Sequence, residues 1–407
     1  MIRSGLVAAL FLSAAATTFA HHGAGTFDLR SSITHSGTLT KVEFINPHSW
    51  LYFEVKEADG RVSKHRCEMR SAHTLRRSGW STELFPVGQQ VTIEASPDRA
   101  DPNSCYLNTI KFADGSHMDR YGQYVKAGGA IREVRGPVNQ PDITKRAYRR
   151  PNGDVNLQGD WAPEQVVMAD PRGTGGGLVP LSQIGETPGE VRGGGARAGA
   201  GAGRPGGARA GGGARAGGGR AGGGARGGGR GNDLLTAAGQ QAADANAKAG
   251  NPRLRCETTS VVFDWTFDGP VNRIIQGSNT IVLQYGQLNL RREIHMNMAK
   301  HPEKITPSRA GHSIGRWEED VLVVDTVGFL PGVYNGNTPN SDKLHLVERF
   351  SLDPKTQRLT RSYTANDPEF WTRELTGQDV VQVADAPYAE DNCKEQGFIN
   401  YAEQQKP

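Results

Sequence analysis

Five side chains that can exchange protons lie in one stretch of the C-terminal half of the chain. Three are histidines and two are carboxylic acids: His301, His312, Asp325, His345 and Glu348. Imidazole changes its charge near neutral pH, and a neighbouring carboxylate can orient it or stabilise its protonated form. These residue types favour general acid–base chemistry, and we predict them as the catalytic set if the protein is an isomerase, lyase or hydrolase.

The two carboxylates lie on segments that alternate between apolar and polar residues, as β-strands do. Alternate residues of a strand share a face, so Asp325 and Glu348 are each expected on a face that is otherwise apolar. A carboxylate is costly there unless it is paired. Two interpretations remain open: the carboxylates form ion pairs with arginines such as Arg316 and Arg349, or they line a polar pocket inside a barrel.

The segment 311–315 reads GHSIG and fits the G-x-S-x-G pattern of serine hydrolases. Asp325 and His345 follow Ser313 in the order that such hydrolases use. The motif needs a strand, a sharp turn and then a helix, whereas the residues after Gly315 predict a β-hairpin. A serine hydrolase is therefore a minor alternative.

The first twenty residues predict an export signal. Arg3 is followed by a short apolar run, and Thr18 and Ala20 place small residues where a signal peptidase cuts. We expect cleavage after Ala20 and a periplasmic location if the cell is Gram-negative.

Cleavage there would make His21 the first residue of the mature protein. Its α-amine and imidazole can chelate one metal ion, with His22 adjacent and His48 in the turn NPHSW. Three nitrogens suit Cu(II), and Zn(II) is the other candidate. The arrangement resembles the N-terminal histidine brace of exported copper proteins. The alternative is that both histidines simply lie at an exposed, frayed terminus.

The four cysteines fall as two pairs, Cys67 with Cys105 and Cys256 with Cys393. C-x-x-C spacing, which would indicate a metal site, is absent. In an oxidising compartment we expect one disulfide bond in each half of the chain.

Residues 21–120 predict an OB-like domain, a five-stranded barrel with one helix. Alternating segments at 33–45, 49–57 and 61–70 are followed by a short helix at 71–80, and then by strands at 89–97 and 105–115. Ser71 is the expected N-cap and Gly79 the terminator of the helix. Residues 121–152 are interpreted as a linker.

Residues 153–403 predict a second, mainly β module. Short strands at even spacing favour an antiparallel meander or barrel. The expected strands lie at 260–267, 271–277, 279–286, 288–296, 311–329 (a hairpin), 344–352 and 358–367.

The second module is interrupted at 192–231 by a run of Gly, Ala and Arg, which predicts a disordered insertion. Its eight arginines exceed the formal net charge of +4, so the rest of the chain is mildly acidic. Aromatic residues, which stack on bases, are absent from the run, and export argues against nucleic acid as a partner. A flexible spacer is the simplest interpretation, and weak contact with an anionic envelope surface is the alternative.

Two resemblances follow from these motifs. AHHGAGTFD, INPHSW, LRRSGW and FADG, over about residues 20–118, resemble a family of exported bacterial domains of unknown function that begin AHHG and carry an NPH motif. LQGDW, HPEKITPS, HSIGRWEEDVLVVDTVGF and DPEFW, over about 153–395, resemble a second uncharacterised exported family. The chain departs from that second pattern before His301, where MNMAK replaces a turn richer in Asp, Gly and Arg.

The sequence therefore predicts an exported protein with two β modules. Its leading predicted function is binding of a metal ion or small ligand. A β-barrel enzyme that uses the His/Asp/Glu set and a structural envelope protein are the alternatives.

Overall fold

The computed structural model describes residues 27–125, 127, 132–134, 141–168, 178–183 and 234–395. The predicted signal peptide at 1–20, His21, His22 and the Gly/Arg-rich run at 192–231 lie outside these residues.

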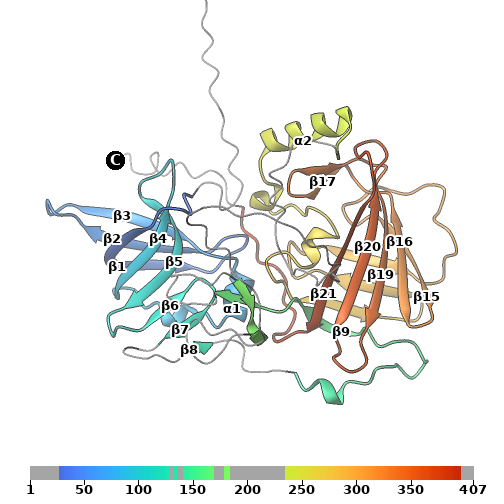
Figure 1. Cartoon of the computed structure of the whole chain (residues 1–407), viewed down its shortest axis with the longest axis horizontal. Helices are drawn as coiled ribbons and strands as arrows, with labels where there is room; N and C mark the ends of the chain where they lie inside the picture. Colours follow the sequence, from blue (N-terminus) through green and yellow to red (C-terminus); the bar gives the residue numbers. More distant parts are fainter. Residues whose placement is uncertain are drawn as a thin grey trace, which may run out of the picture.

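The N-terminal half forms a closed five-stranded barrel, as predicted. Its strands pair in the order β3-β2-β1-β4-β5, and a parallel pairing of β5 with β3 closes the ring. The strands are β1 (Ile33–Glu43), β2 (Trp50–Lys56), β3 (Val62–Glu68), β4 (Gln90–Pro97) and β5 (Ser104–Phe112). In the chain, helix α1 (Ala72–Arg77; Figure 1) and the 3-10 turn η2 (Thr82–Leu84) follow β3 and precede β4, which gives the OB-like order.

A glycine lets the first strand bend around the barrel. A Cβ atom on Gly37 would lie 2.4 Å from the backbone oxygen of Glu54 on β2, so only glycine fits that approach. The barrel core packs Leu39, Leu51, Ile93, Leu107 and Trp80, all at most 1% exposed. The predicted Cys67–Cys105 disulfide is present in this core and joins β3 to β5.

The sheet continues beyond the barrel into the segment predicted as a linker. Strands β6 (His117–Asp119), β7 (Gln123–Val125) and β8 (Arg132–Val134) extend it from β5. The linker prediction for 121–152 missed β7 and β8, because three-residue strands give too little alternation to recognise.

The second half forms a closed nine-stranded barrel. The order is β12-β13-β14-β15-β16-β19-β20-β21-β9, and β9 closes the ring between β21 and β12. The strands are β9 (Gly159–Ala162), β12 (Asn272–Gln276), β13 (Thr280–Gln284), β14 (Arg291–His295), β15 (His312–Glu318), β16 (Val321–Val327), β19 (His345–Leu352), β20 (Leu359–Asn366) and β21 (Leu375–Val383).

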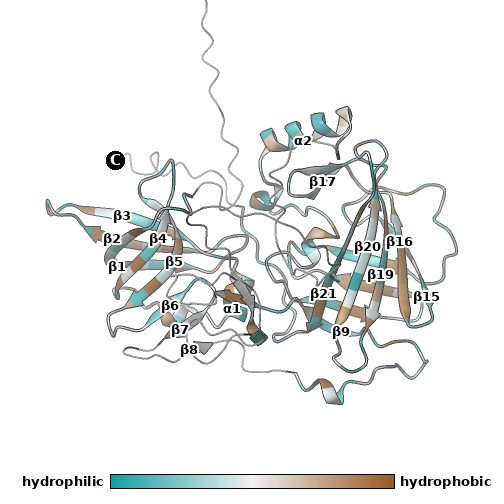
Figure 2. Cartoon of the chain, in the orientation of Figure 1, coloured by the Kyte–Doolittle hydropathy of each residue, from teal (hydrophilic) through white to brown (hydrophobic). Residues whose placement is uncertain are grey.

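Hydrophobic and hydrophilic residues alternate along these strands, as on β19 (Figure 2). The inward residues build a core around Trp161, Trp265, Leu346 and Phe350. Neighbouring strands are antiparallel except β14 and β15, which run parallel. A parallel pair needs a connection that crosses from one end of the strands to the other. Residues 296–311 make that crossing, and they carry His301.

One predicted strand is wrong. Residues 260–267 form a tight turn with the 3-10 segment η6 (Phe263–Trp265). The Ser260 hydroxyl accepts hydrogen bonds from the backbone amides of Val262 and Phe263, and the buried Asp264 carboxylate accepts one from the amide of Thr259. Side chains that bond the local backbone in this way replace the strand ladder.

The remaining elements lie outside the barrel strands. They are η3 (Ile143–Lys145), β10 (Val166–Met168), β11 (Leu178–Pro180), η4 (Leu181–Gln183), α2 (Ala237–Ala249), η5 (Pro252–Arg255), β17 (Gly332–Asn335) and β18 (Thr338–Asn340). The hairpin of β10 and β11 packs against Tyr121 of the N-terminal half. The predicted Cys256–Cys393 disulfide is present. Among the described residues, no helix has the length and apolar character needed to cross a membrane.

Candidate functional site

Four of the five predicted acid–base residues meet on the outer face of the second barrel. Ser313, Thr326, Leu346 and Glu348 point inward and are fully buried, so the alternating positions His312, Asp325 and His345 point outward. The 296–311 crossing brings His301 onto the same face.

Asp325 is the centre of this cluster. Its Oδ1 atom accepts from the Nε2 atoms of His301 and His345, at 3.1 and 3.0 Å. The other nitrogen of His301, Nδ1, lies 2.9 Å from Nδ1 of His312. A continuous chain of polar contacts therefore runs from His345 through Asp325 and His301 to His312.

A further histidine, which the sequence reasoning missed, supports the cluster. The ring of His295 stacks on that of His312, with centroids 5.0 Å apart. The sequence does contain an indication of its position. Along β14, Arg291, Glu293 and His295 are the polar alternate residues, and this period predicts that His295 points outward. Partial burial, followed by the neighbouring His295 and His301, lowers the pKa of His312, so this ring is neutral at pH 7.

The cluster is open to water. The side chains of His301, Asp325 and His345 are 18%, 29% and 45% exposed. Its nitrogens can therefore reach a dissolved ion or solute without any movement of the barrel.

Glu348 lies apart from the cluster, inside the barrel. It pairs with Arg292, and its Oε1 atom is 3.2 Å from Arg361 Nη1; all three side chains are at most 1% exposed. Glu348 is therefore paired with arginines, as one of the two interpretations held, but its partners are not the two arginines named as examples: Arg316 and Arg349 both pair with the outer residue Glu318. The Glu348 carboxylate thus neutralises charge of the two buried arginines in the core, and it does not contribute to the outer site.

Ser313 also points inward. Its hydroxyl accepts from Arg292 Nε at 2.9 Å and contacts the Thr326 hydroxyl at 3.0 Å. Asp325 and His345 lie on the opposite side of the same barrel wall, so these three residues form no hydrolase triad in this structure.

The predicted metal residue His48 lies in the first barrel. Its Nδ1 atom is 2.9 Å from Glu68 Oε1. Burial alone would lower the pKa of His48, but the Glu68 carboxylate outweighs it and raises that pKa. Its predicted partners His21 and His22 are outside the described residues, so the histidine brace stays a prediction. Within the described ranges, no group of three or more His, Cys, Asp and Glu side chains has the arrangement of a metal site.

Comparison with known proteins gives one match, in the N-terminal part of the chain. No curated protein and no solved structure matches the chain. The predicted resemblance of the second module to another family is not confirmed. Residues 9–105, which include β1 to β4 and the start of β5, match the family described as "Family of unknown function (DUF6152)", and the chain therefore contains a DUF6152 domain there.

Proposed function

We propose that this protein binds a divalent transition-metal ion, Cu(II) in preference to Zn(II), between His301 and His312 on the outer face of the second barrel. The observation that carries the proposal is the 2.9 Å separation of the two Nδ1 atoms.

That separation matches two nitrogen ligands at right angles around one ion. With metal–nitrogen bonds of about 2.0–2.1 Å, such ligands are about 2.9 Å apart, whereas tetrahedral ligands are about 3.3 Å apart. Right-angled nitrogen ligation is the preference of Cu(II). The two imidazoles would occupy neighbouring positions, and water would complete the coordination.

Asp325 supports this assignment. Ligating histidines commonly donate their second N–H to a carboxylate, which fixes the ring and its tautomer. His301 has this partner, because its Nε2 lies 3.1 Å from Asp325 Oδ1. Its Nδ1 lone pair is then directed away from Asp325, toward His312. The Nδ1–Nδ1 contact of the metal-free protein is a hydrogen bond, so binding of an ion between the two nitrogens would release its proton.

The same residues carry the alternative function. Acid–base catalysis by His301, His312, Asp325 and His345 stays a prediction, as does the brace at His21, His22 and His48. We also infer export, since all four cysteines are paired in disulfides and disulfides persist in oxidising compartments.

The test is Cu(II) titration of the chain processed after Ala20, followed by calorimetry and electron paramagnetic resonance. We expect one tight ion with nitrogen hyperfine structure, and at least a 100-fold weaker Kd in His301→Ala and in His312→Ala. Asp325→Asn should weaken binding about 10- to 100-fold, as loss of a supporting carboxylate does.

His48→Ala is the matched control, and it should leave this binding unchanged. Binding that survives the His301→Ala/His312→Ala double variant would refute the proposed site. Loss of binding in His48→Ala alone would instead favour the histidine brace.

A further inference from the structure

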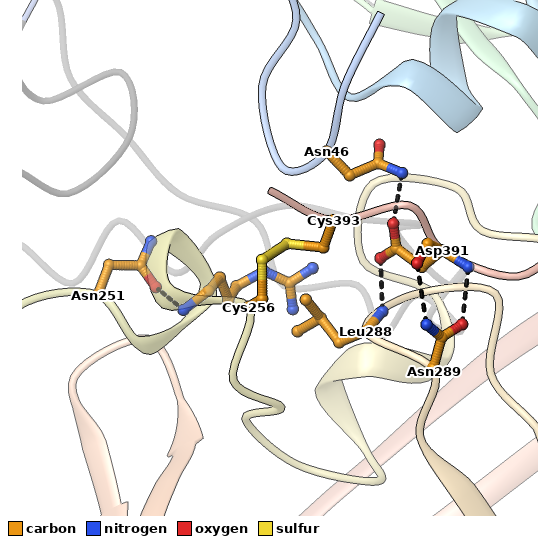
Figure 3. The surroundings of a disulfide bond; sticks show 8 residues. Asn46, Asn251, Cys256, Leu288, Asn289, Asp391 and Cys393 are labelled. Carbon is orange, nitrogen blue, oxygen red and sulfur yellow. Dashed lines mark hydrogen bonds between the residues drawn. A yellow bond between two sulfur atoms is a disulfide. The ribbon is translucent and has the colours of Figure 1, made fainter. Parts of the chain in front are cut away.

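The chain that follows the last strand of the second barrel runs between the two barrels. We call residues 384–394 the strap. It begins with a hydrogen bond from the Ala384 amide to the backbone oxygen of Asp160. Near its end, Cys393 forms a disulfide bond with Cys256 (Figure 3).

The strap contacts the first barrel at the turn between β1 and β2. Asp391 Oδ1 accepts from Asn46 Nδ2 at 2.5 Å, and the Lys394 amide donates to the backbone oxygen of Asn46 at 3.0 Å. Asn46 and Asp391 are 4% and 7% exposed, so this contact is shielded from water. Figure 3 shows Asp391 between Asn46 and the turn that carries Leu288 and Asn289.

A second contact comes from helix α1. Arg77 is 4% exposed, and its guanidinium binds the Asp385 carboxylate through two hydrogen bonds, at 2.8 and 3.1 Å. It also donates to the backbone oxygens of Gly269 and Pro163. All four of these hydrogen bonds reach residues outside the first barrel, so Arg77 is placed to join the two halves.

The second barrel holds the other side of the strap. The Leu288 amide donates to Asp391 Oδ2 at 2.6 Å, and Asn289 exchanges two hydrogen bonds with the backbone of Asp391. Asp391 is therefore bonded on both sides, and Cys393 fixes the strap two residues later.

We propose that the face of the first barrel formed by the 45–49 turn and α1 is a recognition surface for an extended acidic segment. Its ligand in this protein is the strap, with carboxylates at Asp385 and Asp391, and the Cys256–Cys393 disulfide keeps the strap docked. This assigns an interaction role to the DUF6152 domain, independently of the proposed metal site.

The charge of Arg77 and the tethering by the disulfide together explain why the strap stays bound to this face. A buried guanidinium is costly without its carboxylate, so Arg77 favours a docked acidic partner over an empty face. The disulfide holds that partner at a high effective concentration. Without the disulfide, the hydrogen bonds and the ion pair described above would have to hold the strap.

The test is hydrogen–deuterium exchange of the full chain, read at the Lys394 and Leu288 amides. In the Cys256→Ser/Cys393→Ser variant we expect both amides to exchange at least tenfold faster, while amides of β2, β4, β16 and β19 keep their protection. Asp391→Asn, which keeps the shape but removes the charge, should act in the same direction.

Asp320→Asn is the matched control. Asp320 pairs with Arg149 away from the strap, so the Lys394 and Leu288 amides should be unaffected. Unchanged exchange in both the disulfide and Asp391 variants would refute the docking role of the strap. Loss of protection throughout both barrels would show that the strap is part of the fold and not a docked ligand.

Discussion

At the residue scale, the second barrel uses carboxylates of two kinds. Asp325 lies outside, where its oxygen orients two imidazoles that water can reach. Glu348 lies inside, between two buried arginines. The two are separated only by the thickness of the barrel wall, because Asp325 lies on β16 and Glu348 on the adjacent strand β19 with opposite orientation.

Removal of the inner carboxylate should be strongly destabilising. Glu348→Ala leaves Arg292 without its carboxylate partner and Arg361 with only Asp379. Breaking a buried ion pair in this way costs about 3–5 kcal/mol. We expect a matching loss in the free energy of unfolding, measured with urea. Glu318→Ala, which removes an exposed partner of Arg316 and Arg349, should change it little. Equal effects of the two substitutions would contradict this account.

The candidate site was predictable as a set of residues but not as a geometry. His301, His312, Asp325 and His345 were identified from their types, and the strand period predicted a common face for alternate residues. The period does not say which face is inner: both carboxylates were expected on the apolar face, and Glu348 lies there, whereas Asp325 points outward. The 2.9 Å contact of His301 with His312 depends on the 296–311 crossing, and no local pattern predicts its path.

At the scale of elements, alternation predicted the longer strands and failed on the short or polar ones. The OB-like order of the first barrel was confirmed strand by strand. β9 has only four residues, and β21 reads LTGQDVVQV with little apolar contrast. Helix α2 has no apolar stripe, since only Gly239 and Ala243 are buried in it, so it gave no helical signal.

The bend of β1 gives a prediction for a single element. Gly37→Ala would place a methyl group against the Glu54 backbone on β2, and the two strands must move apart. Overpacking of this kind costs about 1–3 kcal/mol. We expect a lower Tm by circular dichroism, whereas Ser36→Ala, at the neighbouring exposed position, should change it little. A Gly37→Ala variant as stable as the original chain would mean that β1 bends elsewhere.

At the scale of the whole molecule, the two barrels share partly buried charges at their junction. Arg70 of the first barrel pairs with Asp268 of the second at 3.2 Å, and Thr74 donates to the backbone oxygen of Asp268. Burial would raise the pKa of Asp268, but Arg70, His73 and Arg253 together lower it below its usual value. The junction is therefore sensitive to acid.

The sign of that sensitivity follows from the lowered pKa. Ionised Asp268 stabilises the folded protein above the unfolded carboxyl pKa of about 3.9, and this contribution is lost as the pH falls through the lower folded value. Asp268→Asn should therefore reduce stability at pH 6 and reduce the further loss between pH 4 and pH 2.5. Thermal unfolding at pH 6 and between pH 4 and pH 2.5 measures these two effects, and Asp342→Asn, at an exposed position, is the control. Parallel pH profiles for Asp268→Asn and the original chain would exclude Asp268 as the source.

The closure of the two barrels has a consequence for the order in which they fold. The first barrel closes when β5 meets β3, within residues 33–112. In the second barrel, β9 pairs with β12 and β21. The ring therefore closes only when Ala162 of β9 pairs with Gln382 of β21, which is far from it in the sequence. Pairings between such distant residues slow folding, because the loop must close before the contacts form. During synthesis the first barrel can therefore reach its final form while the second remains an open sheet with free edges, and refolding should show a fast phase for the first and a slow phase for the second.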